Sequence, residues 1–128
     1  MFKHHLIGAA ALLAMAGAQA DDYSPTYTQC MDKASSTLAM GACIQAETKL
    51  QDDRLNRVYK QLMSKLEPQQ QKDLREVQRS WVKYRDGNCA FHGTLSNGSL
   101  YRIEGAMCLM DMSKDRAAEL ERVLSPGQ

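Results

Sequence analysis

Polar side chains recur at helical spacing in two stretches of the chain, on the same faces as apolar residues. The six polar residues on these faces are Asp52, Asn56, Tyr59, Gln78, Trp81 and Arg85. Asparagine is a mediocre helix former, and the indole N–H of a buried tryptophan needs a hydrogen-bond acceptor. We therefore expect a structural polar network that sets how two helices pack. A ligand site built from the same groups is the alternative.

A methionine cluster has the chemistry of a copper site. Met107, Met110 and Met112 surround Cys108, and thioether sulfur favours copper(I) in oxidising compartments. On a helix, however, Met110 and Met112 point in nearly opposite directions. Methionine is also a common gap-filler in protein cores, so we expect no metal here and keep a periplasmic copper-binding protein as a minor alternative.

Acidic residues are the remaining candidates for chemistry. Glu47, Glu76 and Glu104 have the residue type that glycosidases use in pairs, but solvated helix faces explain most carboxylates of this chain. The sequence has no nucleophile motif and no phosphate-binding loop. We therefore expect no enzyme activity, no catalytic residue and no cofactor.

Residues 1–20 have the pattern of a cleavable signal peptide. Lys3 precedes an uncharged apolar run from Leu6 to Met15, and Ala18-Gln19-Ala20 has the form of a cleavage site. The run is too short to span a bilayer, which takes about 20 apolar residues. We expect cleavage after Ala20 and a periplasmic or secreted protein without membrane insertion. Because the residue directly after the cleavage site is Asp21 and not a cysteine, we do not expect a lipoprotein.

Residues 21–128 have a length that suits one domain. The whole chain has a formal net charge of +1 at pH 7, and removal of Lys3 brings the remainder to neutrality. A neutral domain lacks the electrostatic attraction that nucleic acids and anionic lipids require. We therefore expect no nucleic-acid partner.

The four cysteines are expected to form two disulfides. They are Cys30, Cys43, Cys89 and Cys108, and all of them follow the predicted cleavage site. An even count in an exported chain indicates disulfides, and four cysteines allow three pairings. Pairing cysteines that are close in sequence costs least in loop closure, which favours 30–43 and 89–108 over the crossed arrangements. The spacings match no compact zinc motif.

Apolar residues at helical spacing predict helices over 26–34, 38–66, 68–89 and 99–124. Ser24 and Pro25 start the first helix, and Gly87-Asn88 is expected to stop the third. The inward face of the third helix is expected to hold Leu74, Val77, Gln78, Trp81, and Tyr84 or Arg85. The predicted fold is all-α: an antiparallel bundle of three long helices plus a short N-terminal helix, stapled by two disulfides.

Residues 90–98 contain two glycines and are expected to form an exposed loop. A disulfide between Cys89 and Cys108 would hold this loop as a constrained tip. A pre-ordered loop loses less entropy when it binds a partner. The candidate partner-binding residues are Phe91, His92, Ser96 and Asn97. An ordinary helix connection with no partner is the alternative.

The cysteine pattern and two longer motifs resemble a known family. The motifs are Asp52-x-x-Leu55-Asn56-x-x-Tyr59-x-x-Leu62 and Leu74-x-x-x-Gln78-x-x-Trp81-x-x-Tyr84-Arg85-Asp86-x-x-Cys89. Towards the C-terminus they are joined by Gly98-Ser99, Cys108 and Arg116-x-x-Glu119-Leu120. These features cover nearly all of residues 21–128 and resemble the lysozyme inhibitor LprI-like N-terminal domain family. The resemblance implies a small secreted helical domain.

Two classes of function are expected. The first, which the resemblance implies, is a non-catalytic protein-binding module that inhibits a lysozyme (muramidase), or that binds another envelope protein. The second is an envelope scaffolding or stress protein of unknown partner. The neutral charge predicts little electrostatic attraction to a basic lysozyme. The sequence does not determine the oligomeric state.

Overall fold

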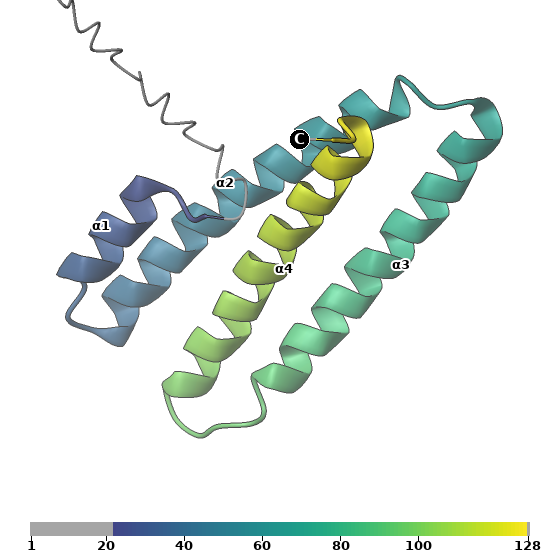
Figure 1. Ribbon diagram of the computed structural model, residues 1–128. Coiled ribbons are helices and arrows are strands. Elements are labelled where there is room, and N and C mark those ends of the chain that lie inside the picture. The colour runs from purple at the N-terminus through teal and green to yellow at the C-terminus, as the bar shows by residue number, and fades with distance from the viewer. Residues whose placement is uncertain (1–21, 128) are drawn as a thin grey trace, which may run out of the picture.

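The computed structural model describes residues 22–127, and the predicted signal peptide lies outside these residues. The chain folds into α1 (Pro25–Lys33), α2 (Thr37–Met63), α3 (Pro68–His92) and α4 (Leu100–Leu124), and the described part contains no strand. Consecutive helices run antiparallel, so that α4 runs alongside α2 in the same direction (Figure 1). The predicted all-α antiparallel bundle of three long helices and a short one is confirmed.

Serine side chains begin the first two helices. The Ser24 hydroxyl accepts a hydrogen bond from the N–H of Tyr27, at 3.1 Å, and Pro25 is the first residue of α1. The Ser36 hydroxyl accepts a hydrogen bond from the N–H of Ala39, also at 3.1 Å. Each bond pairs one of the backbone donors that a helix leaves unsatisfied in its first turn.

The third helix is longer than the sequence predicted, because it continues through Gly87 to His92. Glycine inside a helix costs only about 1 kcal/mol relative to alanine, and tertiary contacts offset this cost. Cys89 is buried and bonded to α4. The helix ends at Gly93, whose N–H donates to the carbonyl of Cys89 at 3.0 Å. Phe91 and His92, expected in a loop, therefore lie in the last turn of α3, and residues 93–99 make the connection.

The packing of α2 against α4 forms the core of the molecule, with α1 lying against α2 and α3 against α4. One apolar cluster joins the N-terminal halves of α2 and α4. Its buried members are Ile44, Ile103 and Met110. Tyr27 and Met31 of α1 pack against it, so α1 covers this half of the seam.

A second apolar cluster joins the C-terminal halves of α2 and α4. Its buried members are Leu55, Val58, Leu62, Ala117 and Leu120. Leu74 and Trp81 of α3 pack against it without being fully buried themselves. The core is therefore built mainly by α2 and α4, and α3 lies on its edge.

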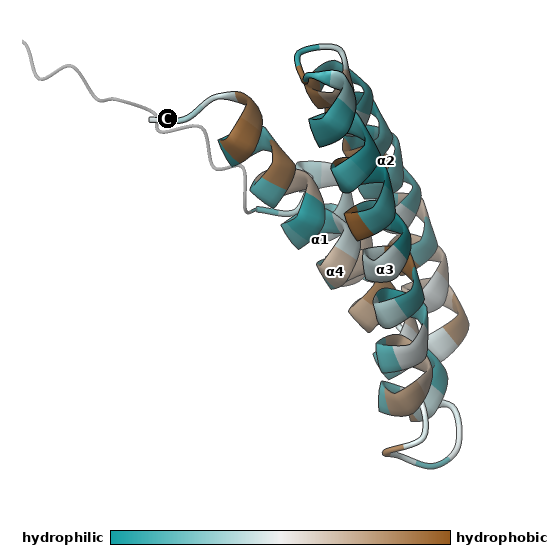
Figure 2. Ribbon diagram, turned by 90° about the vertical axis from the view of Figure 1, so that its right-hand side faces the viewer, coloured by the Kyte–Doolittle hydropathy of each residue, from teal (hydrophilic) through white to brown (hydrophobic). Residues whose placement is uncertain are grey.

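The third helix buries little of its own surface. Cys89 is its one buried residue. Val77, which was expected to face inward, is 54% exposed. Of the two alternatives for the last inward position, Tyr84 is 63% exposed and Arg85 is half-buried. Hydrophilic residues cover much of α2 and α3 (Figure 2). Within residues 22–127, no helix has the length and apolar character needed to cross a membrane.

The two disulfides join neighbouring helices as predicted. Cys30–Cys43 connects α1 to α2, and Cys89–Cys108 connects α3 to α4. The two least buried helices are thus each bonded covalently to one of the two helices that form the core.

Replacement of either disulfide by a pair of serines should lower the free energy of unfolding, by about 2–4 kcal/mol for a typical disulfide. The two variants should differ in how they unfold. Loss of Cys30–Cys43 should release α1 first, whereas loss of Cys89–Cys108 should loosen α3 and the adjoining loop. Amide hydrogen exchange of the two variants measures this difference. If α1 and α3 exchanged at the same rates in the two variants, this prediction would be wrong.

Candidate functional site

The end of the bundle around the α3–α4 connection is a pre-ordered surface, here called the stapled end (residues 89–101 with Cys108). The hydroxyl of Ser96 donates a hydrogen bond to Oε2 of Glu104, at 2.9 Å. The hydroxyl of Thr94 donates to the carbonyl of Phe91, at 2.7 Å. Gly98 has a φ of 72°, in the left-handed region that glycine adopts without strain. These contacts and the disulfide define one conformation for the connection.

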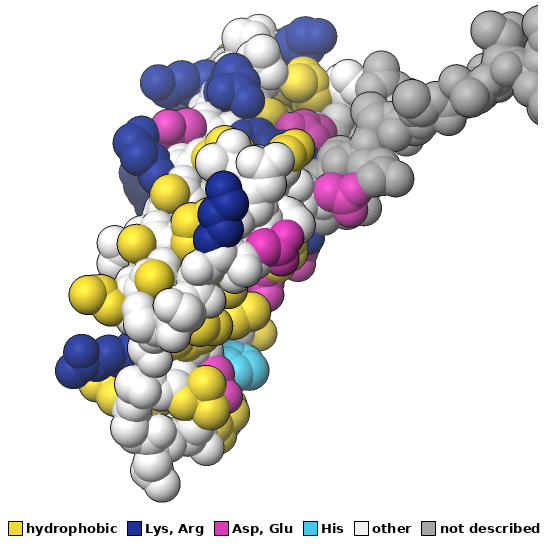
Figure 3. All heavy atoms as spheres, turned by 90° about the vertical axis from the view of Figure 1, so that its left-hand side faces the viewer, with side chains coloured by type: hydrophobic (Ala, Val, Ile, Leu, Met, Phe, Trp, Pro, Cys, Tyr) yellow, Lys and Arg dark blue, Asp and Glu magenta, His cyan; other side chains and the backbone are white. Residues whose placement is uncertain are grey.

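Apolar side chains gather on the stapled end and remain exposed. They are Phe91 (57% exposed), Leu95 (60%), Leu100 (55%) and Tyr101 (38%). The ring of His92 lies edge-on to Phe91, with 5.7 Å between ring centroids. Figure 3 shows hydrophobic side chains at this end of the molecule, with the histidine among them. Contiguous exposed apolar groups mark interaction surfaces more often than scattered ones do.

The four predicted partner-binding residues differ in their surroundings. Phe91 and His92 are exposed on the last turn of α3. Asn97 is also exposed. Ser96 is half-buried and its hydroxyl bonds to Glu104, so this side chain orders the loop.

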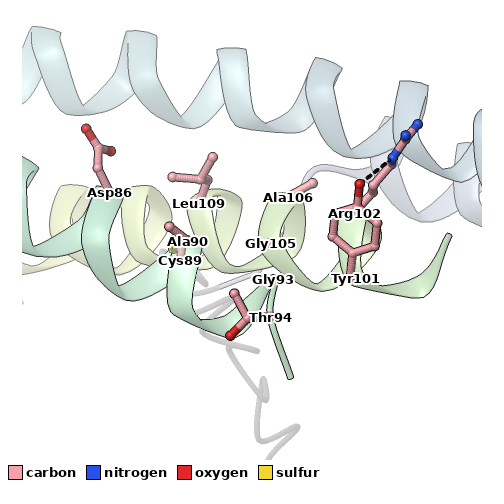
Figure 4. A pocket seen from close by; sticks show the side chains of 10 residues that line it. All are labelled: Asp86, Cys89, Ala90, Gly93, Thr94, Tyr101, Arg102, Gly105, Ala106 and Leu109. Carbon is pink, nitrogen blue, oxygen red and sulfur yellow. Dashed lines mark hydrogen bonds between the residues drawn. The ribbon is translucent and has the colours of Figure 1, made fainter. Parts of the chain in front are cut away.

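An open groove of about 620 Å³ lies between α3 and α4 beside the stapled end. Its floor is made of small residues, among them Gly93 and Gly105, which let the two helices approach closely. Figure 4 shows Asp86 at one end of the groove and Arg102 at the other. The guanidinium of Arg102 donates to the hydroxyl of Tyr101 at 3.1 Å. The groove therefore offers an apolar surface between one acidic and one basic group.

The predicted polar network joins α3 mainly to α4. Nε of Arg116 donates a hydrogen bond to Oε1 of Gln78, at 3.1 Å. Arg85 donates to the hydroxyl of Ser113, at 3.4 Å. Two guanidinium groups lie over the Trp81 ring, that of Arg85 at 5.1 Å and that of Arg116 at 5.9 Å from its centroid. Ser113 and Arg116 are both buried, and neither was predicted to belong to this network.

The α2 side of this network is more open. Asp52 reaches Arg85 with an N–O distance of 3.7 Å. Asn56 is exposed and Tyr59 is half-buried. Asn56 and Tyr59 line a groove of about 420 Å³, here called the α2–α3 groove, which they share with Arg75, Gln78, Arg79 and Val82. The structure thus places these polar side chains around a solvent-accessible depression.

A buried carboxylate, for which the sequence analysis predicted no structural role, lies where α1 meets α2. Glu47 is 2% exposed and accepts hydrogen bonds from the hydroxyl and N–H of Ser24, at 2.6 and 2.9 Å. Nε2 of Gln51 donates a third bond, at 2.8 Å. Burial by itself raises the pKa of Glu47, but these bonds and the charge of Lys114 outweigh it and hold the pKa below its usual value. A signal was available, because Glu47 and Gln51 continue the helical spacing from Leu55 towards the N-terminus.

An ion pair joins the two core helices. Nε and Nη2 of Arg54 on α2 donate to the two carboxylate oxygens of Glu121 on α4, at 2.7 and 2.6 Å. The bond from Arg54 lowers the pKa of Glu121, although partial burial opposes this. Such a bidentate pair fixes the relative position of two helices more closely than a single contact does.

The groups considered for metal binding and catalysis lie in separate places. Met110 is fully buried in the core. The sulfur of Met112 contacts the Cys89 sulfur of the disulfide at 3.7 Å. Glu47 lies under α1, Glu104 bonds to Ser96, and Glu76 is exposed on α3. Within residues 22–127, no group of three or more histidine, cysteine, aspartate and glutamate side chains is arranged to hold a metal ion.

The fold defines a small disulfide-stapled helical domain with exposed apolar side chains at one end. The chain belongs to the lysozyme inhibitor LprI family, which matches residues 30–120. An uncharacterized protein of Rhizobium meliloti (strain 1021) is 25% identical over 110 residues, which cover 75% of this chain and 79% of the relative. No solved structure matches the chain significantly.

Substitution Glu47→Gln tests the buried carboxylate. The pKa of Glu47 is lower in the folded chain than in the unfolded one. Its stabilising effect is therefore present above the unfolded value of about 4.3 and is lost as the pH falls through the folded value. At pH 7 the variant should lose about 1–3 kcal/mol of unfolding free energy.

Urea unfolding at several pH values measures this effect. The difference between wild type and Glu47→Gln should narrow on acidification, because the wild-type carboxylate becomes protonated. Glu76→Gln is the matched control, since Glu76 is exposed, and it should change stability little at any pH. A constant difference between wild type and Glu47→Gln from neutral to acidic pH would show that ionisation of Glu47 does not stabilise the fold.

Proposed function

We propose that this protein is a periplasmic or secreted, non-catalytic module that binds and inhibits a lysozyme. The family match over residues 30–120 carries the proposal, because the family is described as a lysozyme inhibitor. The signal-peptide pattern of residues 1–20 supports export to the compartment in which lysozymes act.

The stapled end is the surface that we assign to lysozyme binding. A muramidase cleft contains sugar-binding subsites and a pair of catalytic carboxyl groups. The Phe91 ring can occupy an apolar part of such a cleft, and the neighbouring His92 can donate a hydrogen bond to a carboxylate. Both side chains are exposed on a rigid helical turn, so little conformational entropy is lost when they bind.

Neighbouring groups extend this surface. Leu95, Leu100 and Tyr101 are exposed beside Phe91 and can enlarge the apolar contact. Arg102, at the margin of the α3–α4 groove, supplies a cation towards an acidic cleft. Because residues 21–128 carry no net charge, affinity would come from this local contact and not from long-range attraction.

An inhibition assay tests the proposal. Purified protein is added to lysozymes of several types, and lysis of cell-wall suspensions is followed. Inhibition of at least one type should saturate near one inhibitor per enzyme. The double substitution of Phe91 and His92 by alanine should weaken it by about ten-fold or more, as expected for residues at the centre of an interface.

The matched control is the double substitution of Val77 and Tyr84 by alanine. These side chains are also exposed on α3 but lie outside the stapled end, so inhibition should be unchanged. If the control weakened inhibition equally, the binding surface would not be confined to the stapled end and would include other parts of α3. Absence of inhibition for every lysozyme type at micromolar concentrations would contradict the proposed function.

A further inference from the structure

Among the residues that it describes, the structure shows no stabilising contact for two arginines of the α2–α3 groove. Arg75 and Arg79 lie one helical turn apart on α3 and both are exposed. Neither guanidinium makes a hydrogen bond or an ion pair with any residue between 22 and 127. Like charges at this spacing destabilise a helix. The pair therefore weakens α3 slightly, and it leaves two cations facing a depression.

The other groups of the groove suit a ligand rich in hydroxyl and amide groups. Asn56 and Gln78 each contribute a carboxamide, and Tyr59 contributes a phenol. The carbonyl oxygen of Gln78 already accepts a bond from the buried Arg116. This contact fixes the orientation of the amide and leaves its N–H donors for another partner. A rigid donor is thus held beside the two cations.

The walls of the groove are positioned by the core and not by a direct contact between them. Tyr59 and Trp81 both pack against the apolar cluster that joins α2 to α4. One turn beyond the groove, Asp52 pairs with Arg85 across the two helices, at 3.7 Å. The opening between α2 and α3 therefore persists without any ligand to hold it.

We propose that the α2–α3 groove is a binding site for a carboxylate-bearing glycan. The planar guanidinium groups of Arg75 and Arg79 match the geometry of a carboxylate. The carboxamides of Asn56 and Gln78 pair with sugar hydroxyl or acetamido groups, and the Tyr59 ring offers an apolar face to a sugar ring. A volume of about 420 Å³ lies within the ordinary range of small-ligand sites.

Charge favours this ligand over a polyphosphate such as nucleic acid. Residues 21–128 are formally neutral, and the two acidic residues Asp73 and Glu76 interrupt the cations of α3. A polyanion requires a wider positive surface than two arginines provide. A single carboxylate on a sugar requires only the two cations of Arg75 and Arg79.

The groove shares no lining residue with the stapled end. The proposed glycan site is therefore independent of lysozyme inhibition, and either activity can be present without the other. If both activities are present, the stapled end binds lysozyme and the α2–α3 groove binds a glycan of the same chemical class as the substrate of lysozyme.

The site is tested by titrating isotope-labelled protein (residues 21–128) with three probes. Binding is measured from the changes in the amide chemical shifts. The first is a tetrasaccharide of alternating N-acetylglucosamine and N-acetylmuramic acid, which carries carboxylates. The second is chitotetraose, a neutral sugar with the same acetamido groups, and the third is inorganic phosphate. The carboxylated sugar should bind saturably, with shifts at Asn56, Tyr59 and Gln78, and about ten-fold more tightly than either other probe.

The double variant Arg75→Gln, Arg79→Gln should bind the carboxylated sugar about ten-fold more weakly. Its control is the double variant Lys72→Gln, Lys83→Gln, which removes the same charge from exposed positions of α3 outside the groove and should bind as wild type does. All four positions are exposed, so neither variant should have a lower melting temperature than the wild type.

Four results would overturn the proposal. Chitotetraose binding as tightly as the carboxylated sugar would exclude the carboxylate as the recognised group. Phosphate binding as tightly would identify an unselective anion site. Absence of saturation at millimolar sugar, or equal effects of the two double variants, would show that the groove is not a glycan site.

Discussion

The packing of α2 against α4 is the contact on which the other two helices depend. No residue of α1 is fully buried, and Cys89 is the one buried residue of α3. Neither helix could bury enough apolar surface to offset the conformational entropy that it loses on folding. Each instead lies against the seam between α2 and α4 and is joined to one of these helices by a disulfide.

The seam itself is interrupted by a polar layer. Glu47, Gln51 and Ser113 are all buried between the two apolar clusters. Every buried polar side-chain atom within residues 22–127 has a hydrogen-bond partner. Glu47 accepts bonds from Ser24 at the start of α1 and from Gln51 of α2, and Ser113 of α4 accepts a bond from Arg85 of α3. Loss of the bonds to Glu47 would leave a carboxylate unpaired in the interior, which would destabilise the fold. The Arg54–Glu121 pair does join α2 to α4, and it favours a single register for these two helices.

Both proposed binding surfaces follow from the position of α3 at the edge of this core. Because α3 packs mainly against α4, its face towards α2 remains open and forms the α2–α3 groove. At the other end of α3, the disulfide to Cys108 holds the last turn against α4, which keeps Phe91 and His92 exposed on a rigid support. A more deeply packed α3 would have covered both surfaces.

The sequence by itself determined the four helices, their order and the pairing of the cysteines. These features are local: Ser24 and Ser36 cap the helices that follow them, periodic apolar residues define α2 and α4, and the cysteines that pair are neighbours in the chain. Helical spacing also predicted that Gln78, Trp81 and Arg85 share one face of α3.

The tertiary structure decided how each helical face is used. Periodicity defines an apolar stripe but not how wide a surface the neighbouring helices cover, and α3 is covered narrowly enough to leave Val77 and Tyr84 in solvent. Glu47 is buried because Ser24 and Gln51 surround its carboxylate, and α3 passes Gly87 because Cys89 is bonded to α4. Helical spacing places Glu47 on the inward face of α2, but its burial also requires Ser24 from outside that helix. The extension of α3 beyond Gly87 likewise requires a partner on α4. Periodicity within one helix does not identify such partners.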